Sequence, residues 1–145
     1  MNTEYSEVSE NKLEGFHDEY LHLSPGERDR ERERALNRAM DKLSKINGEL
    51  DQLNELYKAL DLGNIGEMCV QEIRGLCDIR IGAGQKWFIE YRIRMAESTA
   101  EHIKVSIEQA RKKGVEESLI DAAGKVAKAL GRYADTLKEA YWKLY

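Results

Sequence analysis

Apolar residues recur at alternating steps of three and four from position 36 to position 60, which is the spacing of one face of a helix. Upstream, Ser24 and Glu27 flank Pro25 in the pattern of a capping box with proline at the first helical position. We therefore expect a helix from Pro25 to about Asp61, with Gly63 in the stop position beyond its end. The apolar positions of this helix are Leu36, Ala39, Leu43, Ile46, Leu50, Leu53, Tyr57 and Leu60.

The pair Asn47-Gly48 is the one turn signal inside this predicted helix, and by itself it could split the helix into a hairpin. The apolar stripe keeps its phase across the pair, so we favour one continuous helix. Met40 and Leu56 widen the stripe beyond the seam of a two-stranded coiled coil, which favours a helical bundle. Residues 27–34 alternate in charge at every step and have no apolar face to bury.

The middle of the chain permits two interpretations. Residues 79–95 alternate between apolar and polar residues on either side of Gly82-Ala83-Gly84-Gln85, which would suit a β-hairpin. Helical spacing competes with this alternation and continues for more than twice its length, so we favour helices. A shorter helix over residues 65–81 would use Ile65, Cys69, Ile73, Leu76 and Cys77. The next helix, from about Gln85 to Lys113, would use Ile89, Ile93, Ala96, Ala100, Ile103, Ile107 and Ala110.

The last predicted helix runs from about Val115 to Leu144, directly after a stop at Gly114. So short a connection makes the two final helices antiparallel neighbours. Small residues concentrate where we expect their backbones to approach, including Gly124 and Gly131. The apolar positions of the last helix are Leu119, Ala123, Val126, Leu130, Tyr133, Leu137, Ala140 and Leu144.

These elements predict an all-α fold, an up-down helical bundle of three long helices and one shorter helix with coiled-coil-like packing. The chain has 145 residues, which suits one domain, and we assign the bundle to residues 24–145. Residues 1–23 hold six acidic residues and one basic residue, and we expect a weakly ordered, solubilising segment. Because the net charge is −4, the rest of the chain is close to neutral, so general attraction to nucleic acid or anionic lipid is not expected.

The sequence also predicts a cytoplasmic protein that does not contact membranes. It has no apolar run long enough to span a bilayer, and its first residues, which include Glu4 and Glu7, lack the pattern of a signal peptide. Cys69 and Cys77 lie eight residues apart, about 12 Å along a helix, which is too far for a disulfide. Reduced thiols fit the cytosol.

No catalytic, cofactor or metal motif stands out. One Glu-x-x-His pair, Glu14 with His17, has the spacing used in di-metal bundles, but it contains a glycine and has no second copy. The cysteine spacing does not suit zinc, and no phosphate-binding glycine loop is present. We therefore expect no enzyme, no metal and no cofactor. These patterns are generic to helical proteins and indicate no particular family.

Two binding functions remain. Aromatic and methionine residues that lie beside the main apolar stripes suggest a protein interface at Trp87, Phe88, Tyr91, Met95, Tyr141, Trp142 and Tyr145. Basic residues interleaved with aromatics suggest an alternative, accessory nucleic-acid binding through Arg74, Arg80, Lys86, Arg92, Arg94, Lys125, Lys128 and Arg132. We favour a non-enzymatic interaction or assembly module that is homo-oligomeric or a small subunit of a larger complex, because the apolar helical surface exceeds what one core needs.

Overall fold

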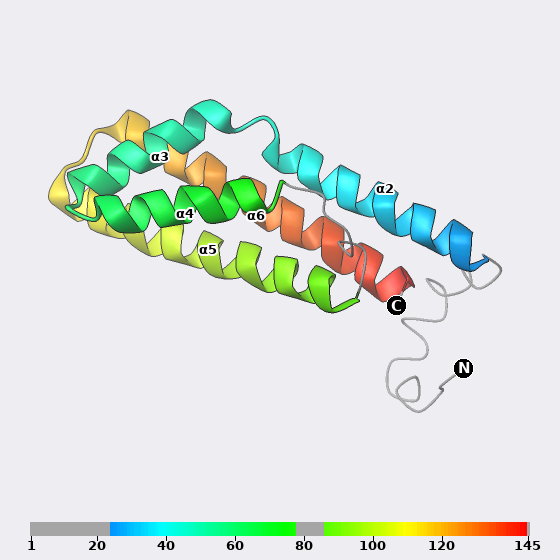
Figure 1. The fold of residues 1–145 in the computed structure, drawn as a ribbon. Helices are drawn as coiled ribbons and strands as arrows, with labels where there is room; N and C mark the ends of the chain where they lie inside the picture. The colour runs from blue at the N-terminus through cyan, green and yellow to red at the C-terminus, as the bar shows by residue number, and fades with distance from the viewer. Residues whose placement is uncertain (1–23, 78–85, 145) are drawn as a thin grey trace.

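A computed structural model describes residues 24–77 and 86–144, and these residues form five helices and no strand (Figure 1). In chain order the helices are α2 (Pro25–Leu43), α3 (Asn47–Ala59), α4 (Gly63–Gly75), α5 (Lys86–Lys113) and α6 (Glu117–Leu144). The prediction of an all-helical fold is confirmed. The acidic segment 1–23 and the predicted turn at Gly82–Gln85 lie outside the described residues. Residues 86–95 are helical, so the second arm of the alternative hairpin is not a strand.

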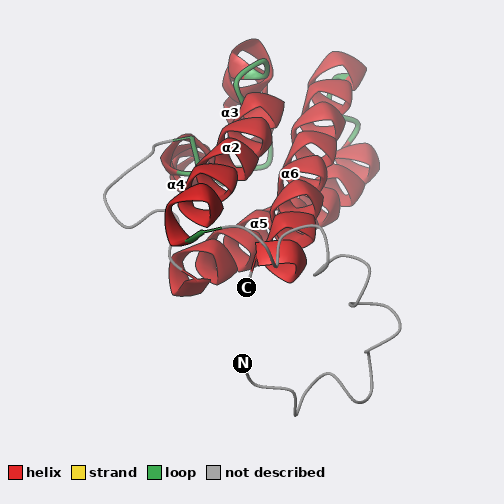
Figure 2. Cartoon of the chain, turned by 90° about the vertical axis from the view of Figure 1, so that its right-hand side faces the viewer, coloured by secondary structure: helices red, strands yellow, loops and turns green. Residues whose placement is uncertain are grey.

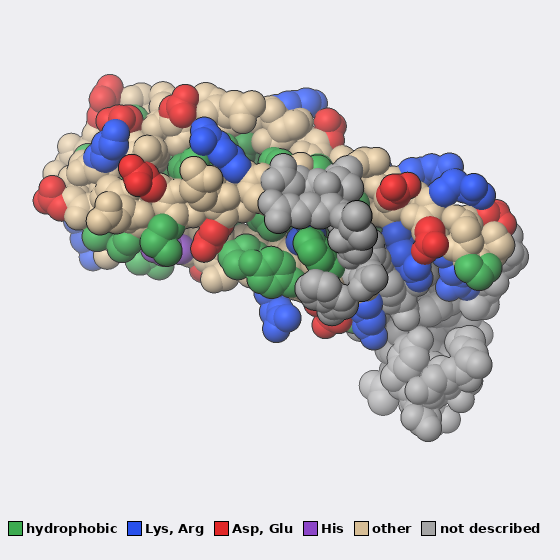
Figure 3. Space-filling model, in the orientation of Figure 1, with side chains coloured by type: hydrophobic (Ala, Val, Ile, Leu, Met, Phe, Trp, Pro, Cys, Tyr) green, Lys and Arg blue, Asp and Glu red, His purple; other side chains and the backbone are tan. Residues whose placement is uncertain are grey.

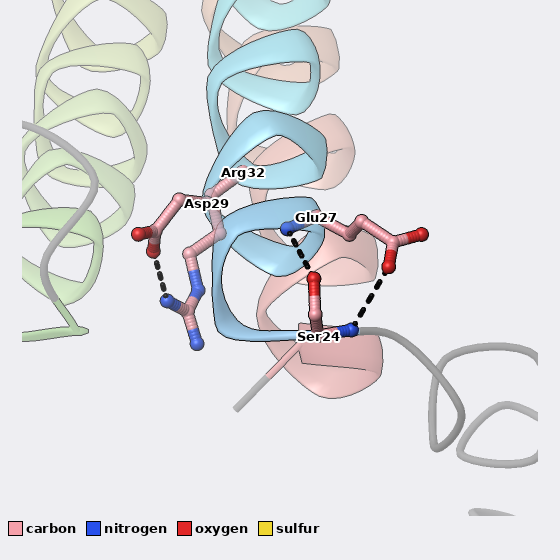
Figure 4. Close-up of polar contacts among 4 residues, drawn as sticks. All are labelled: Ser24, Glu27, Asp29 and Arg32. Carbon is pink, nitrogen blue, oxygen red and sulfur yellow. Dashed lines mark hydrogen bonds and ion pairs between the residues drawn. The ribbon is translucent and has the colours of Figure 1, made fainter.

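The start of α2 has the predicted capping box. The Ser24 side-chain oxygen accepts a hydrogen bond from the Glu27 backbone N–H at 3.2 Å, and the Glu27 carboxylate accepts one from the Ser24 N–H at 3.2 Å (Figure 4). Two N–H groups that the helix itself leaves without partners are thereby satisfied. One turn further on, the Arg32 guanidinium pairs with Asp29 at 2.9 Å.

The predicted continuous helix from Pro25 to Asp61 is wrong, because residues 44–46 interrupt it. The predicted count of three long helices and one shorter helix is therefore not confirmed. At the break the Ile46 N–H bonds to the Leu43 carbonyl, and helix geometry resumes at Asn47. The Asn47-Gly48 pair has low helix propensity, which favours a break here. Ile46 nevertheless stays buried, so the apolar stripe remains in phase. Both α2 and α3 pack on α6 and do not form the hairpin that the pair could have produced (Figure 1).

The two longest helices, α5 and α6, form the most extensive helix pair of the fold and are antiparallel. The turn between them is a Schellman motif, in which the Val115 N–H bonds to the Ala110 carbonyl at 3.0 Å and the Gly114 N–H bonds to the Arg111 carbonyl at 3.2 Å. Gly114 has a φ of 73°, which glycine adopts without strain. The predicted stop at Gly114 is therefore confirmed.

The close approach of backbones occurs at a different glycine from those expected. A Cβ atom added to Gly124 or Gly131 would meet nothing within 4 Å, so neither glycine brings α6 against α5. A Cβ atom at Gly66 would instead lie 2.5 Å from the Cβ atom of Tyr57. Gly66 therefore sets the distance between α4 and α3.

The end of α3 also differs from the expectation, because the stop residue is Asp61 and Gly63 is the first residue of α4. Asp61 has a φ of 60°, and the N–H groups of Asp61 and Leu62 bond to the carbonyls of Lys58 and Tyr57. This is a second Schellman motif, here with a side chain at the left-handed position. It turns the chain so that α4 lies along α3 and α5, apart from α6 in the end-on view of Figure 2.

A candidate interaction surface on helices α4 and α5

Large apolar side chains are exposed on two neighbouring helices. Among the described residues they are Ile65 and Met68 on α4, 40% and 64% exposed, and Tyr91 and Val105 on α5, 49% and 57% exposed. Figure 3 shows hydrophobic side chains along the edge of the molecule where α4 and α5 lie. A single exposed apolar residue is ordinary, but these four lie on two helices that pack against each other, which makes their surface a candidate for contact. We call this surface the α4–α5 face and define it by these four residues and the pocket beside Tyr91.

The pocket beside Tyr91 has a volume of about 210 Å³ and lies between the end of α4 and the first half of α5. Phe88 and Tyr91 meet edge to face on its wall, with ring centroids 6.4 Å apart. The structure thus brings three predicted interface residues, Phe88, Tyr91 and Met95, to one site. The pocket is lined by Glu72, Gly75, Leu76, Phe88, Tyr91, Arg92 and Met95.

Arg92 lies inside the fold, only 2% exposed, and not on the surface where a nucleic acid could reach it. Its guanidinium donates to the Leu76 carbonyl at 2.8 Å and to the Tyr133 hydroxyl at 3.0 Å, and it lies 4.7 Å from the centroid of the Phe88 ring. Leu76 is the C-cap residue of α4, whose carbonyl has no partner within its own helix. Arg92 therefore caps α4 and holds the wall of the pocket.

Arg92 is the first member of a polar row that recurs every seven residues along α5, at Arg92, Thr99, Ser106 and Lys113. Thr99 donates to the Glu72 carboxylate at 3.5 Å, and Ser106 bonds to the Tyr57 hydroxyl at 2.9 Å. Lys113 donates to the Ala59 carbonyl at 3.3 Å. Each member bonds to α4, to α3 or to a residue just beyond the end of one of them, so the row fixes how these helices are aligned with α5. No expectation from the sequence included this row, although a polar repeat of seven residues beside an apolar stripe is a signal that the sequence contains.

A buried cluster around Tyr57 holds groups that resemble a catalytic set. The Tyr57 hydroxyl lies 3.1 Å from Nδ1 of His102, and burial raises the pKa of Tyr57 to about 12. Burial likewise raises the pKa of the nearby Cys69 thiol to about 11. Both groups are therefore protonated at neutral pH, and neither is an activated nucleophile.

The described basic residues of the nucleic-acid prediction lie on three helices, α4, α5 and α6. Arg74 lies 3.9 Å from Asp51, Lys86 lies over the Tyr141 ring at 5.7 Å from its centroid, and Arg94 is exposed on α5. A separate exposed set on α6 consists of Lys125, Lys128 and Arg132.

Some of the predicted interface and nucleic-acid residues fall outside the part of the chain that the structure describes. Arg80 and Tyr145 lie outside the described residues, and so do the side chains of Trp87 and Trp142. Tyr141 is half-buried and packs against the hydrophobic core.

No protein-family model, curated protein or solved structure matches this chain. Within residues 24–77 and 86–144, no three His, Cys, Asp or Glu side chains are grouped so as to bind a metal ion. No helix in the same residues has both the length and the apolar character needed to cross a bilayer.

Proposed function

We propose that this chain is a non-enzymatic helical module for protein–protein interaction or assembly, working as a homo-oligomer or as a small subunit of a larger complex. The observation that carries the proposal is that, among the side chains the structure describes, the large apolar ones that are exposed all lie on α4 and α5. Burying such side chains against a partner is favourable by about 25 cal/mol for each Å² of apolar area. Tyrosine and methionine are also enriched in protein interfaces.

The pocket supports the proposal because interfaces concentrate their binding energy in a few aromatic anchors and the pockets beside them. Tyr91 is half exposed. Its ring packs edge to face on the Phe88 ring, which in turn lies against the Arg92 guanidinium. A partner side chain that entered the pocket would contact Phe88, Met95 and Leu76. Tyr91 is thus the residue whose truncation should weaken association most.

A non-enzymatic role is supported by the protonated state of Tyr57 and Cys69 at neutral pH. Cytoplasmic location is supported by the two free thiols, Cys69 and Cys77. We further propose that the helices form an up-down bundle with coiled-coil-like packing, since the long antiparallel pair α5 and α6 buries alanines at helical spacing. Nucleic-acid binding is the weaker function because one of its predicted residues, Arg92, is buried and bonds within the fold.

Sedimentation velocity over a wide concentration range tests the proposal. The wild-type chain should associate, and Tyr91→Ala should raise the dissociation constant about tenfold, equivalent to about 1.4 kcal/mol. Lys128→Ala, an exposed change on α6, is the control and should leave association unchanged. A wild-type chain that stays monomeric at every concentration, while circular dichroism shows it to be folded, would overturn the homo-oligomer and leave only the role of a small subunit in a larger complex.

A further inference from the structure

The outer surface of α5 carries a second stripe at alternating steps of four and three, formed by Tyr91, Met95, Ser98, His102 and Val105. All five are exposed or half-buried, whereas the core stripe of the same helix is buried. Ser98 lies in the middle, seven residues from Tyr91 and seven from Val105, about 10 Å along the helix in each direction. The stripe is therefore apolar at both ends and polar near its centre.

The two ends of the α4–α5 face differ in shape. Leu76, at the end of α4, bonds to Arg92, and Glu72 bonds to Thr99, so α4 runs antiparallel to α5. The start of α4 thus lies at the level of Val105, where Gly66 contacts Tyr57 and Tyr57 bonds to Ser106. One end of the face consequently presents the exposed side chains of Ile65, Met68 and Val105. The other end presents the pocket lined by Phe88, Tyr91 and Met95.

A two-fold axis near Ser98 would place each end of one copy on the opposite end of a second copy. The exposed apolar side chains at the Val105 end would then meet the pocket at the Tyr91 end, twice in the same dimer. This is the self-complementary arrangement that a two-fold interface requires.

The charges flanking the stripe favour the same arrangement. Arg94 is exposed and forms no ion pair with the described residues. Glu101, seven residues further along α5, is exposed too, and its ion pair with Lys104, 3.3 Å long, is a solvent-exposed one that contributes little. Antiparallel pairing of two α5 helices about Ser98 brings Arg94 of each copy to Glu101 of the other. A parallel pairing would instead bring like charges together, which is destabilising.

We propose that the α4–α5 face binds a second copy of this chain in an antiparallel two-fold dimer whose axis passes near Ser98. This inference rests on the proposed function and names its partner.

Charge reversal tests the geometry. Arg94→Glu and Glu101→Arg should each weaken self-association about tenfold, because each places like charges together at two symmetric positions. An equal mixture of the two variants should recover association to within about threefold of wild type, since unlike charges then meet again. Both residues are exposed, so the variants should fold, which circular dichroism will check.

A cross-link gives an independent readout. Ser98→Cys should form an intermolecular disulfide in air faster than wild type, and faster than Ser118→Cys, an exposed control on α6. If the wild-type chain associates and Tyr91→Ala weakens it, but neither charge reversal nor the cross-link behaves as stated, the antiparallel dimer is overturned and the proposed function stands. A wild-type chain that remains monomeric overturns the dimer together with the homo-oligomeric form of the proposed function.

Discussion

The guanidinium of Arg92 donates to the carbonyl of Leu76 at 2.8 Å, so a buried cation on α5 closes the C-terminal end of α4. A cation at this end of a helix also opposes the negative end of the helix dipole. The Tyr133 hydroxyl, 3.2 Å from the same carbonyl, joins α6 to this contact. Three helices therefore meet at one hydrogen-bonded point beside the pocket.

Removing this contact should be costly. We expect Arg92→Met to lower the free energy of unfolding by about 2–3 kcal/mol, because charged hydrogen bonds to Leu76 and Tyr133 are lost inside the fold. Arg132→Met, an exposed change on α6 and outside the α4–α5 face, should alter it by less than about 0.5 kcal/mol. Urea unfolding of both variants measures the difference, and equal effects would contradict the assigned role of Arg92.

Gly66 allows α4 to approach α3, so a methyl group there should be destabilising. We expect Gly66→Ala to cost about 1–3 kcal/mol, since the added Cβ would lie 2.5 Å from Cβ of Tyr57. Gly124→Ala is the matched control, because open space surrounds that position in the interior of α6. It should stabilise the fold by up to about 1 kcal/mol through helix propensity. Thermal unfolding that ranked the two variants in the opposite order would refute this account of the α3–α4 contact.

Asp61 holds a left-handed backbone conformation that glycine adopts more easily. We expect Asp61→Gly to raise the free energy of unfolding by about 0.5–1 kcal/mol. The loss of its exposed ion pair with Lys113, 3.4 Å long, should subtract little. Lys113→Ala in the Asp61→Gly background isolates the lysine's remaining bond to Ala59. A less stable Asp61→Gly variant would show that the aspartate side chain contributes more than the strain it tolerates.

Burial of Tyr57 makes stability depend on pH in the alkaline range. Its pKa is raised from 10.0 to about 12 in the folded chain, so folding favours the protonated phenol. The resulting stabilisation is complete below pH 10 and is lost as pH rises toward about 12, because the unfolded chain releases its proton first. Urea unfolding between pH 9 and 11 should show a steeper loss of stability for wild type than for Tyr57→Phe. Parallel curves for the two proteins would contradict the burial of this hydroxyl.

The sequence predicted the buried surfaces better than the backbone that carries them. Ile46 and Leu50 continue the apolar stripe across the break, because periodicity reports which side chains face the core and not whether the helix is continuous. The role of Arg92 depends on the contact between residues 76 and 92, which are far apart in the sequence, so no local pattern predicts it.

Phe88, Tyr91 and Met95 could be grouped from the sequence since they share one helix. The pocket they form also needs Gly75 and Leu76 from α4.

The central claim, that this chain self-associates through the α4–α5 face, is tested most directly by methyl NMR over a dilution series. The account predicts that the methyl resonances of Ile65, Met68 and Val105 change with concentration. Those of Leu36 and Leu137, buried between α2 and α6, should stay constant. Resonances that all remain unchanged, or changes centred on α2 and α6, would contradict it.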